Sequence, residues 1–159
     1  FQDSPTPSTN SAAAIVLARL HGLTGNAIYR EWAQRTLEAF ATLAPQFGLY
    51  AATYGLAAML HSRHALQVVI TGAKGDAKAA ALESAANSVY RFGKSALRVT
   101  PEIVATGALA PALKETIPHL DAGAPRAFVC VGASCHPPVS EPEKLIELLT
   151  GASLQAAAR

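Results

Sequence analysis

The fold of this chain is decided by residues 67–89, which have the sequence QVVITGAKGDAKAAALESAANSV. The first part, residues 67–71, is a short β-branched run that ends at Gly72, and it predicts a buried strand. Residues 76–92 then change to helical spacing, with an apolar face made of Leu82, Ala85, Ala86 and Val89. A strand followed by a helix marks the start of an α/β region.

Two further strands are predicted after this helix, at residues 96–100 and 126–131, with a short helix at residues 109–117 between them. A last helix follows Pro142, and Ser140 with Glu143 has capping-box spacing. Strands that are separated by helices usually pair in parallel through right-handed crossovers. We therefore expect residues 66–159 to form a small three-stranded parallel sheet with flanking helices.

The preceding part of the chain, residues 1–65, opens with a loop rich in Pro, Ser and Thr and then has a helical pattern. A first helix is expected from a cap at Asn10 or Ser11 to Gly22. A second follows a break and cap at Gly25 and Asn26, and its apolar stripe consists of Tyr29, Ala33, Leu37, Phe40 and Ala44. A third, over residues 50–63, is apolar nearly all round and is expected to be buried on more than one side. The fold class is thus mixed α/β, with a helical first region and an α/β second region.

Composition limits the functions to consider. Half of the 159 residues are hydrophobic and 15% are charged, which is enough apolar material for a core. The 13 basic and 11 acidic residues are scattered, so neither nucleic acid nor an anionic membrane is an expected partner. Because two cysteines do not make a disulfide scaffold, a cytoplasmic location is the default expectation. The absence of an initiator Met suggests a piece of a longer polypeptide.

Four segments together resemble a known family. The opening DSPTPSTNS keeps Asp3, Pro7, Ser8, Asn10 and Ser11 of an Asp-x-x-x-Pro-Ser-Gly-Asn-Ser turn, with Thr9 in place of the glycine. Residues 23–40, LTGNAIYREWAQRTLEAF, and the strand QVVITG follow. The end, AFVCVGASCHPPVSEPEKLIELL, is similar to a Tyr-Val-Cys-x4-Cys-x-x-Pro-Val-Thr pattern, with Phe128 for the tyrosine and Ser140 for the threonine. The chain resembles the spermatogenesis-associated protein 20 family over residues 3–149.

This resemblance implies a larger protein, in which a thioredoxin-like domain precedes a six-hairpin helical toroid similar to those of sugar epimerases and glycosidases. Residues 1–65 would be a toroid segment, and residues 66–159 an added α/β subdomain. The implied partner is the missing N-terminal part of the parent chain, and cut helix faces suggest a homo-oligomer. The family's activity is unassigned, and its sugar chemistry is only a fold-level analogy.

Cys130 and Cys135 are the residues most suited to redox chemistry. Their C-x4-C spacing differs from the C-x-x-C redox motif. We expect Cys130 to be buried in a strand and Cys135 to be accessible in a loop, with both thiols free. The alternatives are a Cys130–Cys135 disulfide, which the spacing permits, and a metal site recruiting His136 and His119 as further ligands.

The remaining candidates are weaker. His61 and His64 are spaced to share one helix face, but histidines near helix ends, His21 included, more often favour the negative end of the dipole. Residues 72–76, GAKGD, can hold a phosphate at a helix start or simply form a tight turn, and the turn is favoured. No metal and no cofactor is expected.

Asp3 and Asn10 are the candidates for sugar chemistry, because their loop would face the cleft of a toroid. Glycoside hydrolysis needs two positioned carboxylates, and no second acid has a clear claim. We therefore expect this chain to be a non-catalytic structural part of the larger protein. The alternative is a segment that contributes residues to a sugar-processing or thiol-redox enzyme.

Overall fold

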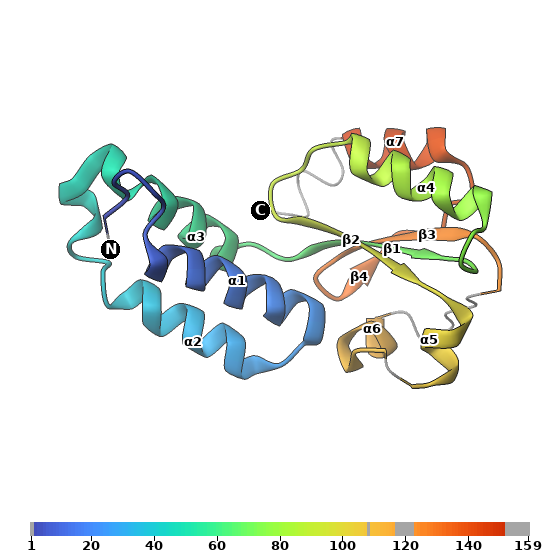
Figure 1. Ribbon diagram of the computed structural model, residues 1–159, viewed down its shortest axis with the longest axis horizontal. Coiled ribbons are helices and arrows are strands. Elements are labelled where there is room, and N and C mark those ends of the chain that lie inside the picture. The colour runs from blue at the N-terminus through green and yellow to red at the C-terminus, as the bar shows by residue number, and fades with distance from the viewer. Residues whose placement is uncertain (1, 108, 117–122, 152–159) are drawn as a thin grey trace. The chain divides into compact units, whose positions relative to one another are not determined.

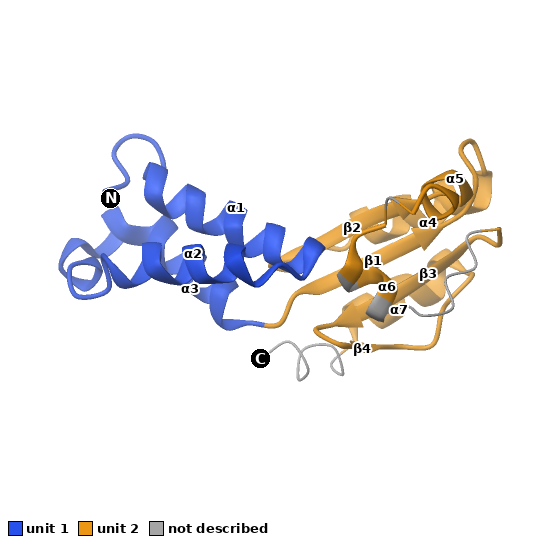
Figure 2. Ribbon diagram, turned by 90° about the horizontal axis from the view of Figure 1, so that it is seen from below, with its two compact units in different colours: residues 1–63 blue, residues 64–159 orange. Residues whose placement is uncertain are grey.

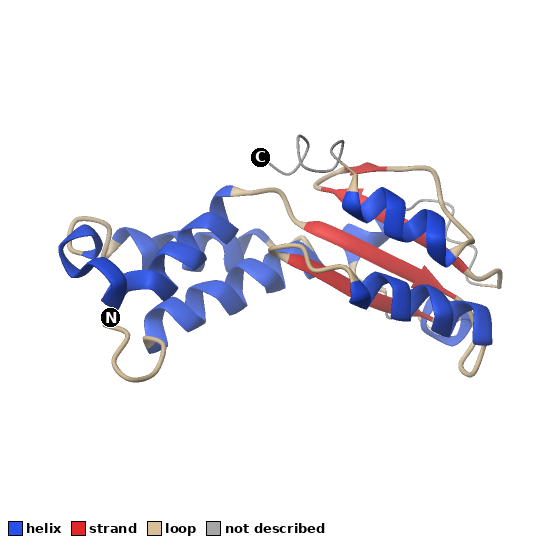
Figure 3. Cartoon of the chain, turned by 90° about the horizontal axis from the view of Figure 1, so that it is seen from above, coloured by secondary structure: helices blue, strands red, loops and turns tan. Residues whose placement is uncertain are grey.

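The computed structural model describes residues 2–107, 109–116 and 123–151. The chain forms two compact units, Phe1–Arg63 and His64–Arg159, which are coloured separately in Figure 2. The first unit is helical, and the second combines helices with one sheet (Figure 3).

The helical unit contains three α-helices and a 3₁₀ segment: α1 (Thr9–Thr24), α2 (Ala27–Glu38), η1 (Ala44–Ala51) and α3 (Ala52–Ser62). Both α2 and α3 pack against α1. The break predicted at Gly25 and Asn26 is confirmed, because the Asn26 side chain accepts a hydrogen bond from the Ile28 N–H and caps α2. The predicted limits of α1 were wrong. Ser8 is its N-cap, and the helix continues past Gly22 to Thr24.

Small residues form the core of this unit. Ala14, Leu37 and Ala57 are buried together, with Ile15, Tyr54 and Ala58 partly buried against them. The prediction that the third helix is buried on more than one side was wrong for this chain, because Leu56 and Met59 of α3 remain 46% and 43% exposed. The helix is apolar all round, but α1 and α2 can cover only part of its surface.

The α/β unit contains four strands and four helices in the described part of the chain: β1 (Leu66–Thr71), α4 (Ala77–Ser88), β2 (Lys94–Val99), α5 (Pro101–Ala105), α6 (Pro111–Thr116), β3 (Arg126–Val131), β4 (Ser134–Cys135) and α7 (Pro142–Thr150). Pro142 begins α7 as expected. The predicted cap was wrong, because Glu141 is the N-cap residue and its side chain makes no capping hydrogen bond at the N-terminus of α7.

The sheet has the strand order β2-β1-β3-β4 and is mixed. β1 pairs in parallel with β2, but β3 is antiparallel to β1 and β4 is antiparallel to β3. The expectation of a three-stranded parallel sheet was therefore wrong, although the mixed α/β class is confirmed.

The lengths of the connecting helices explain this difference. α4 has 12 residues and, at about 1.5 Å per residue, returns the chain along a six-residue strand of about 20 Å. α5 and α6 have only 5 and 6 residues, so neither can span the sheet. Accordingly β3 starts where β2 ends, because Thr71 pairs with both Val99 and Arg126.

Helices cover both faces of the sheet (Figure 1). One face packs against α4 and α7, and its core includes Val68, Ile70, Leu82, Val129 and Leu145. The opposite face packs against α5 and α6 through a second core of Val69, Val99, Leu109, Leu113 and Cys130. Because β1 lies between β2 and β3 with both faces covered, all six of its residues are buried.

Candidate functional site

The two cysteines are joined by a disulfide. Cys130 on β3 lies directly opposite Cys135 on β4, with an S–S distance of 2.04 Å and Cα atoms 4.0 Å apart. The His136 N–H donates to the Val129 carbonyl, 2.9 Å away, so the neighbouring Cys130–Cys135 pair is of the non-hydrogen-bonded kind. In such pairs the side chains come closest, which explains the bridge. The expectation of two free thiols was wrong, and the disulfide alternative holds.

The two halves of the bridge have very different surroundings, as the sequence predicted. Cys130 is 2% exposed and lies in the core formed with Val69 and Leu113. Cys135 is exposed, because β4 has only two residues and lies at the edge of the sheet. Of the two bridged residues, Cys135 is therefore the one that borders solvent.

A tight turn holds His64 beside this disulfide. Gly132, with φ of 57°, follows β3 in the turn to β4, a conformation that favours glycine. Its N–H donates to the Ala65 carbonyl, 3.0 Å away. A Cβ on Gly132 would lie 3.3 Å from Nδ1 of His64, so the imidazole lies against the turn.

The turn and its neighbours line a pocket of about 530 Å³. Its walls are His64 and residues 131–137, so Cys135, His136 and the imidazole of His64 face the same space. Imidazole is the side chain that exchanges protons most readily near neutral pH. The pocket therefore combines an exposed disulfide half with two groups that can transfer protons.

A metal site finds no support among the described residues, where no group of three or more His, Cys, Asp or Glu side chains is placed to hold an ion. The bridge also removes both thiolates that the metal alternative needed. His119, the fourth candidate ligand, lies outside the described residues.

Asp3 proves to be a helix-capping residue. Its carboxylate accepts hydrogen bonds from the N–H groups of Ser8 and Thr53, each 2.7 Å away. Thr53 is in the first turn of α3, which has no cap of its own at the adjacent residue. These hydrogen bonds hold the pKa of Asp3 below its usual value of 3.8, and the bond from the Thr53 N–H has the largest effect. A general acid needs a raised pKa, so Asp3 is poorly suited to that role.

Asn10, the second sugar-site candidate, is exposed in the first turn of α1. The capping that its segment was expected to provide comes from Ser8, whose hydroxyl oxygen accepts from the Ser11 N–H at 3.1 Å. The DSPTPSTNS motif therefore has a structural use: Asp3 caps α3, and Ser8 caps α1. The structure gives Asn10 no contact that points to chemistry on a sugar.

The histidines do not share a helix face as expected. α3 ends at Ser62, so His64 lies beyond the helix, in the other unit. His61 lies in α3. Its pKa is lowered from the usual 6.5, mainly by partial burial and to a lesser degree by the nearby charges of Arg30 and His21. His21 in turn lies 3.2 Å from the Asn26 carbonyl through Nδ1.

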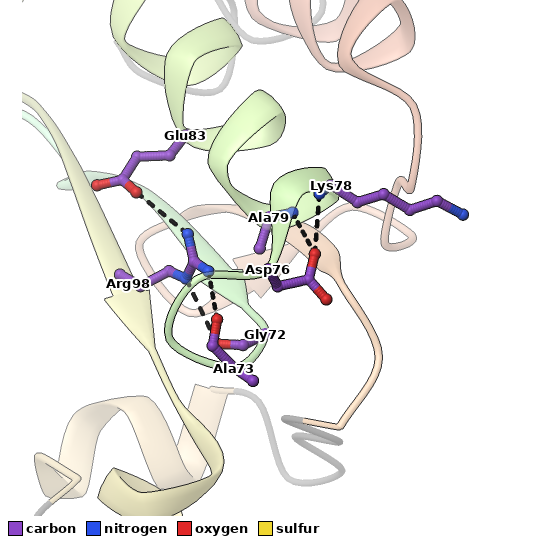
Figure 4. Close-up of polar contacts among 7 residues, drawn as sticks. All are labelled: Gly72, Ala73, Asp76, Lys78, Ala79, Glu83 and Arg98. Carbon is purple, nitrogen blue, oxygen red and sulfur yellow. Dashed lines mark hydrogen bonds and ion pairs between the residues drawn. The ribbon is translucent and has the colours of Figure 1, made fainter.

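The connection between β1 and α4 is a tight turn, shown in Figure 4. The Asp76 carboxylate accepts from the N–H groups of Lys78 and Ala79, at 2.9 and 3.0 Å. Arg98 donates to the carbonyl of Ala73 at 2.7 Å and pairs with Glu83 at 3.2 Å. The N–H groups that would hold a phosphate are thus already bonded to a carboxylate, so phosphate binding here is disfavoured.

Neither β4 nor the position of His64 beside the hairpin was predicted from the sequence. Two residues are too few for a periodic signal, and Pro137 and Pro138 suggested only a loop. The signal that could have revealed the hairpin is Gly132-Ala133 between Val131 and Ser134, since two residues with glycine first suit a tight β-turn.

Comparison with protein-family models, curated proteins and solved structures found no match to this chain. In the described part of the chain, no helix combines the length and apolar character needed to cross a bilayer.

Proposed function

We propose that the α/β unit carries out thiol–disulfide exchange through the Cys130–Cys135 bridge. The observation that carries this proposal is the exposure of Cys135 in a pocket that also contains His64 and His136. Exchange begins with attack of a thiolate on an accessible sulfur, so access to one half of the bridge is its first requirement. A buried bridge would not meet this requirement.

The position of the bridge also argues against a purely stabilising role. It closes a loop with a sequence separation of only 5, between residues that the hairpin already pairs. Closing such a short loop removes little conformational entropy from the unfolded chain, and the resulting contribution to the free energy of unfolding is about 2 kcal/mol. The hairpin also pairs Val131 with Ser134, and Ala127 pairs with Val139, so pairing along this edge extends beyond the bridge.

The order of elements describes the fold of the α/β unit. The unit consists of a strand–helix–strand segment, two short helices, a hairpin and a last helix, with strand order β2-β1-β3-β4. Fold alone does not establish function. C-x-x-C near a βαβ pattern is the usual redox motif, and the connection between β1 and α4 has no cysteine in this chain. The reactive pair that we propose therefore lies elsewhere, on the hairpin.

The helical unit is proposed to be a structural part of a larger toroid-type protein that also has a thioredoxin-like domain. The resemblance of residues 3–149 supports this, and the exposed faces of α3 leave room for further helices. The sugar-processing alternative is weakened by Asp3, whose carboxylate is occupied in capping.

The proposal is tested by mixing the oxidised chain with a reduced dithiol peptide and following the oxidation of the peptide. We expect one peptide disulfide per chain, formed while the far-ultraviolet circular dichroism stays unchanged. A Cys135→Ser variant is the control and should oxidise none. Failure of the native chain to oxidise any peptide would rule the proposal out.

A further inference from the structure

We infer that the exchange has a fixed direction of attack: Cys135 forms the mixed disulfide, Cys130 is the thiol that leaves, and the partner is a dithiol whose second thiol resolves the mixed disulfide. This inference rests on the proposed function and adds to it the order of steps and the class of substrate. It follows from the unequal surroundings of the two sulfurs and from the register of the hairpin.

The first step is fixed by access. Cys130 is 2% exposed, whereas Cys135 is exposed at the pocket. An incoming thiolate therefore forms a new S–S bond to the sulfur of Cys135. The Cys130–Cys135 bond breaks, and its electron pair leaves with the sulfur of Cys130.

The second step depends on where that leaving sulfur lies. Val69, Leu109 and Leu113 share a core with Cys130, so the sulfur that is released there stays inside the folded unit. The hairpin also holds Cys130 directly opposite Cys135. Cys130 therefore attacks the mixed disulfide at Cys135 again and expels the incoming thiol, unless another thiol reacts sooner.

Only a dithiol supplies that second thiol without a second collision. Its other thiolate attacks its own sulfur in the mixed disulfide and closes a new disulfide, and Cys135 leaves as a thiolate. The dithiol has lost two electrons and two protons, and Cys130 and Cys135 have gained them as two thiols. A monothiol must instead compete, from bulk solution, with the intramolecular attack by Cys130.

His64 and His136 line the space in which these proton transfers occur. Either imidazole can take a proton from the incoming thiol or return one to Cys135. The imidazole of His64 lies against the turn at Gly132, so one of the two groups is next to the hairpin.

The site of attack is tested with Cys130→Ala and Cys135→Ala variants, each treated with a chromogenic aryl disulfide. In the folded chain we expect the remaining Cys135 to react at least about 100-fold faster than the remaining Cys130, since a buried thiol reacts only after local opening. In denaturant the two should react alike. Because Cys130→Ala can disturb the core, the mixed disulfide is also located in the wild-type chain, by acid quenching and peptide mapping.

The substrate class is tested by comparing the rates at which dithiothreitol, reduced thioredoxin and a monothiol open the bridge. The ratio of dithiol to monothiol rates should be at least about tenfold larger for the folded chain than for the unfolded chain. A faster reaction with thioredoxin than with dithiothreitol identifies a protein dithiol, and the reverse identifies a small one; both support the inference.

Two results would overturn it. An adduct on Cys130, or equal dithiol-to-monothiol ratios for folded and unfolded chain, would contradict the proposed direction while leaving thiol exchange itself intact. Opening of the bridge only after unfolding would instead remove the proposed function, and this inference with it.

Discussion

At the residue scale, the stability contributed by the disulfide can be separated from that of the core. Cys135 is exposed and Cys130 stays in the core, so Cys135→Ala removes the bridge and leaves the buried cysteine in place. We expect this variant to lower the free energy of unfolding by about 2 kcal/mol, the entropy of one short loop. Urea denaturation of both chains under oxidising conditions measures the difference. In reductant the difference should vanish; a loss that persists there would mean that Cys135 stabilises the fold in another way.

Gly72 is a second informative residue, because a neighbouring side chain leaves no room for a Cβ at this position. It has φ of 138°, and an added Cβ would lie 2.7 Å from the Cβ of Ala79. Gly75 has φ of 86° but open space around its Cα, so it provides a matched control. We expect Gly72→Ala to destabilise the α/β unit by roughly 1–3 kcal/mol more than Gly75→Ala, because only the first substitution adds overpacking to backbone strain. Thermal unfolding of the two variants tests this, and equal losses would contradict it.

Residue-level prediction from the sequence succeeded where a side chain acts locally. The burial of Cys130 and the cap at Asn26 follow from immediate neighbours. The role of Asp3 could not be predicted this way, since its partner Thr53 is 50 residues away. The disulfide likewise depends on a register that no single residue defines.

At the scale of elements, the N-terminal loop stabilises the start of α3. The pKa of Asp3 is lowered in the folded state, chiefly by the hydrogen bond from the Thr53 N–H, so the ionised form favours folding. Its stabilising effect is complete above the ordinary value of 3.8 and is lost as the pH falls through the lowered folded value.

Asp3→Asn should therefore lower the melting temperature of the helical unit at neutral pH, and the difference from wild type should shrink below pH 3.8. Circular dichroism melts across this range make the measurement. Glu31→Gln is the control, because Glu31 forms only an exposed ion pair with Arg35 and should change little. A difference that is constant with pH would show that the Asp3 charge does not stabilise α3.

Sequence periodicity predicts an element when the element is long enough to show a repeat. β1, α4 and β3 are long enough for their periodicity to be recognised, and all were expected. The antiparallel direction of β3 was not expected, because the direction of a strand depends here on the lengths of α5 and α6 and not on the residues of β3 itself. Alternation of strands and helices predicts a parallel sheet only when each connecting helix can span a strand.

At the scale of the whole molecule, exposed apolar side chains are concentrated in the helical unit. The large ones described there as exposed are Val16, Ile28, Trp32, Leu43, Leu49, Tyr50, Leu56 and Met59. Because exposed apolar surface of this kind often marks an interaction site, we expect the chain to self-associate.

Light scattering should give a mass that rises with concentration above the 16.5 kDa of one chain. Leu49→Lys, at a side chain that is 90% exposed, should reduce this association. Tyr90→Lys is a matched control, because Tyr90 is 83% exposed but lies in the α/β unit. A constant monomer mass at high concentration would contradict the prediction.

We propose that the Cys130–Cys135 bridge opens and closes while the protein remains folded. Equilibration in glutathione buffers of graded potential tests it most directly, with thiols counted by mass after alkylation and folding followed by circular dichroism. The account predicts two thiols per chain, a midpoint above about −300 mV and an unchanged spectrum, as expected for an exchangeable disulfide. A midpoint below that value, or reduction that occurs only together with unfolding, would contradict it and identify the bridge as structural.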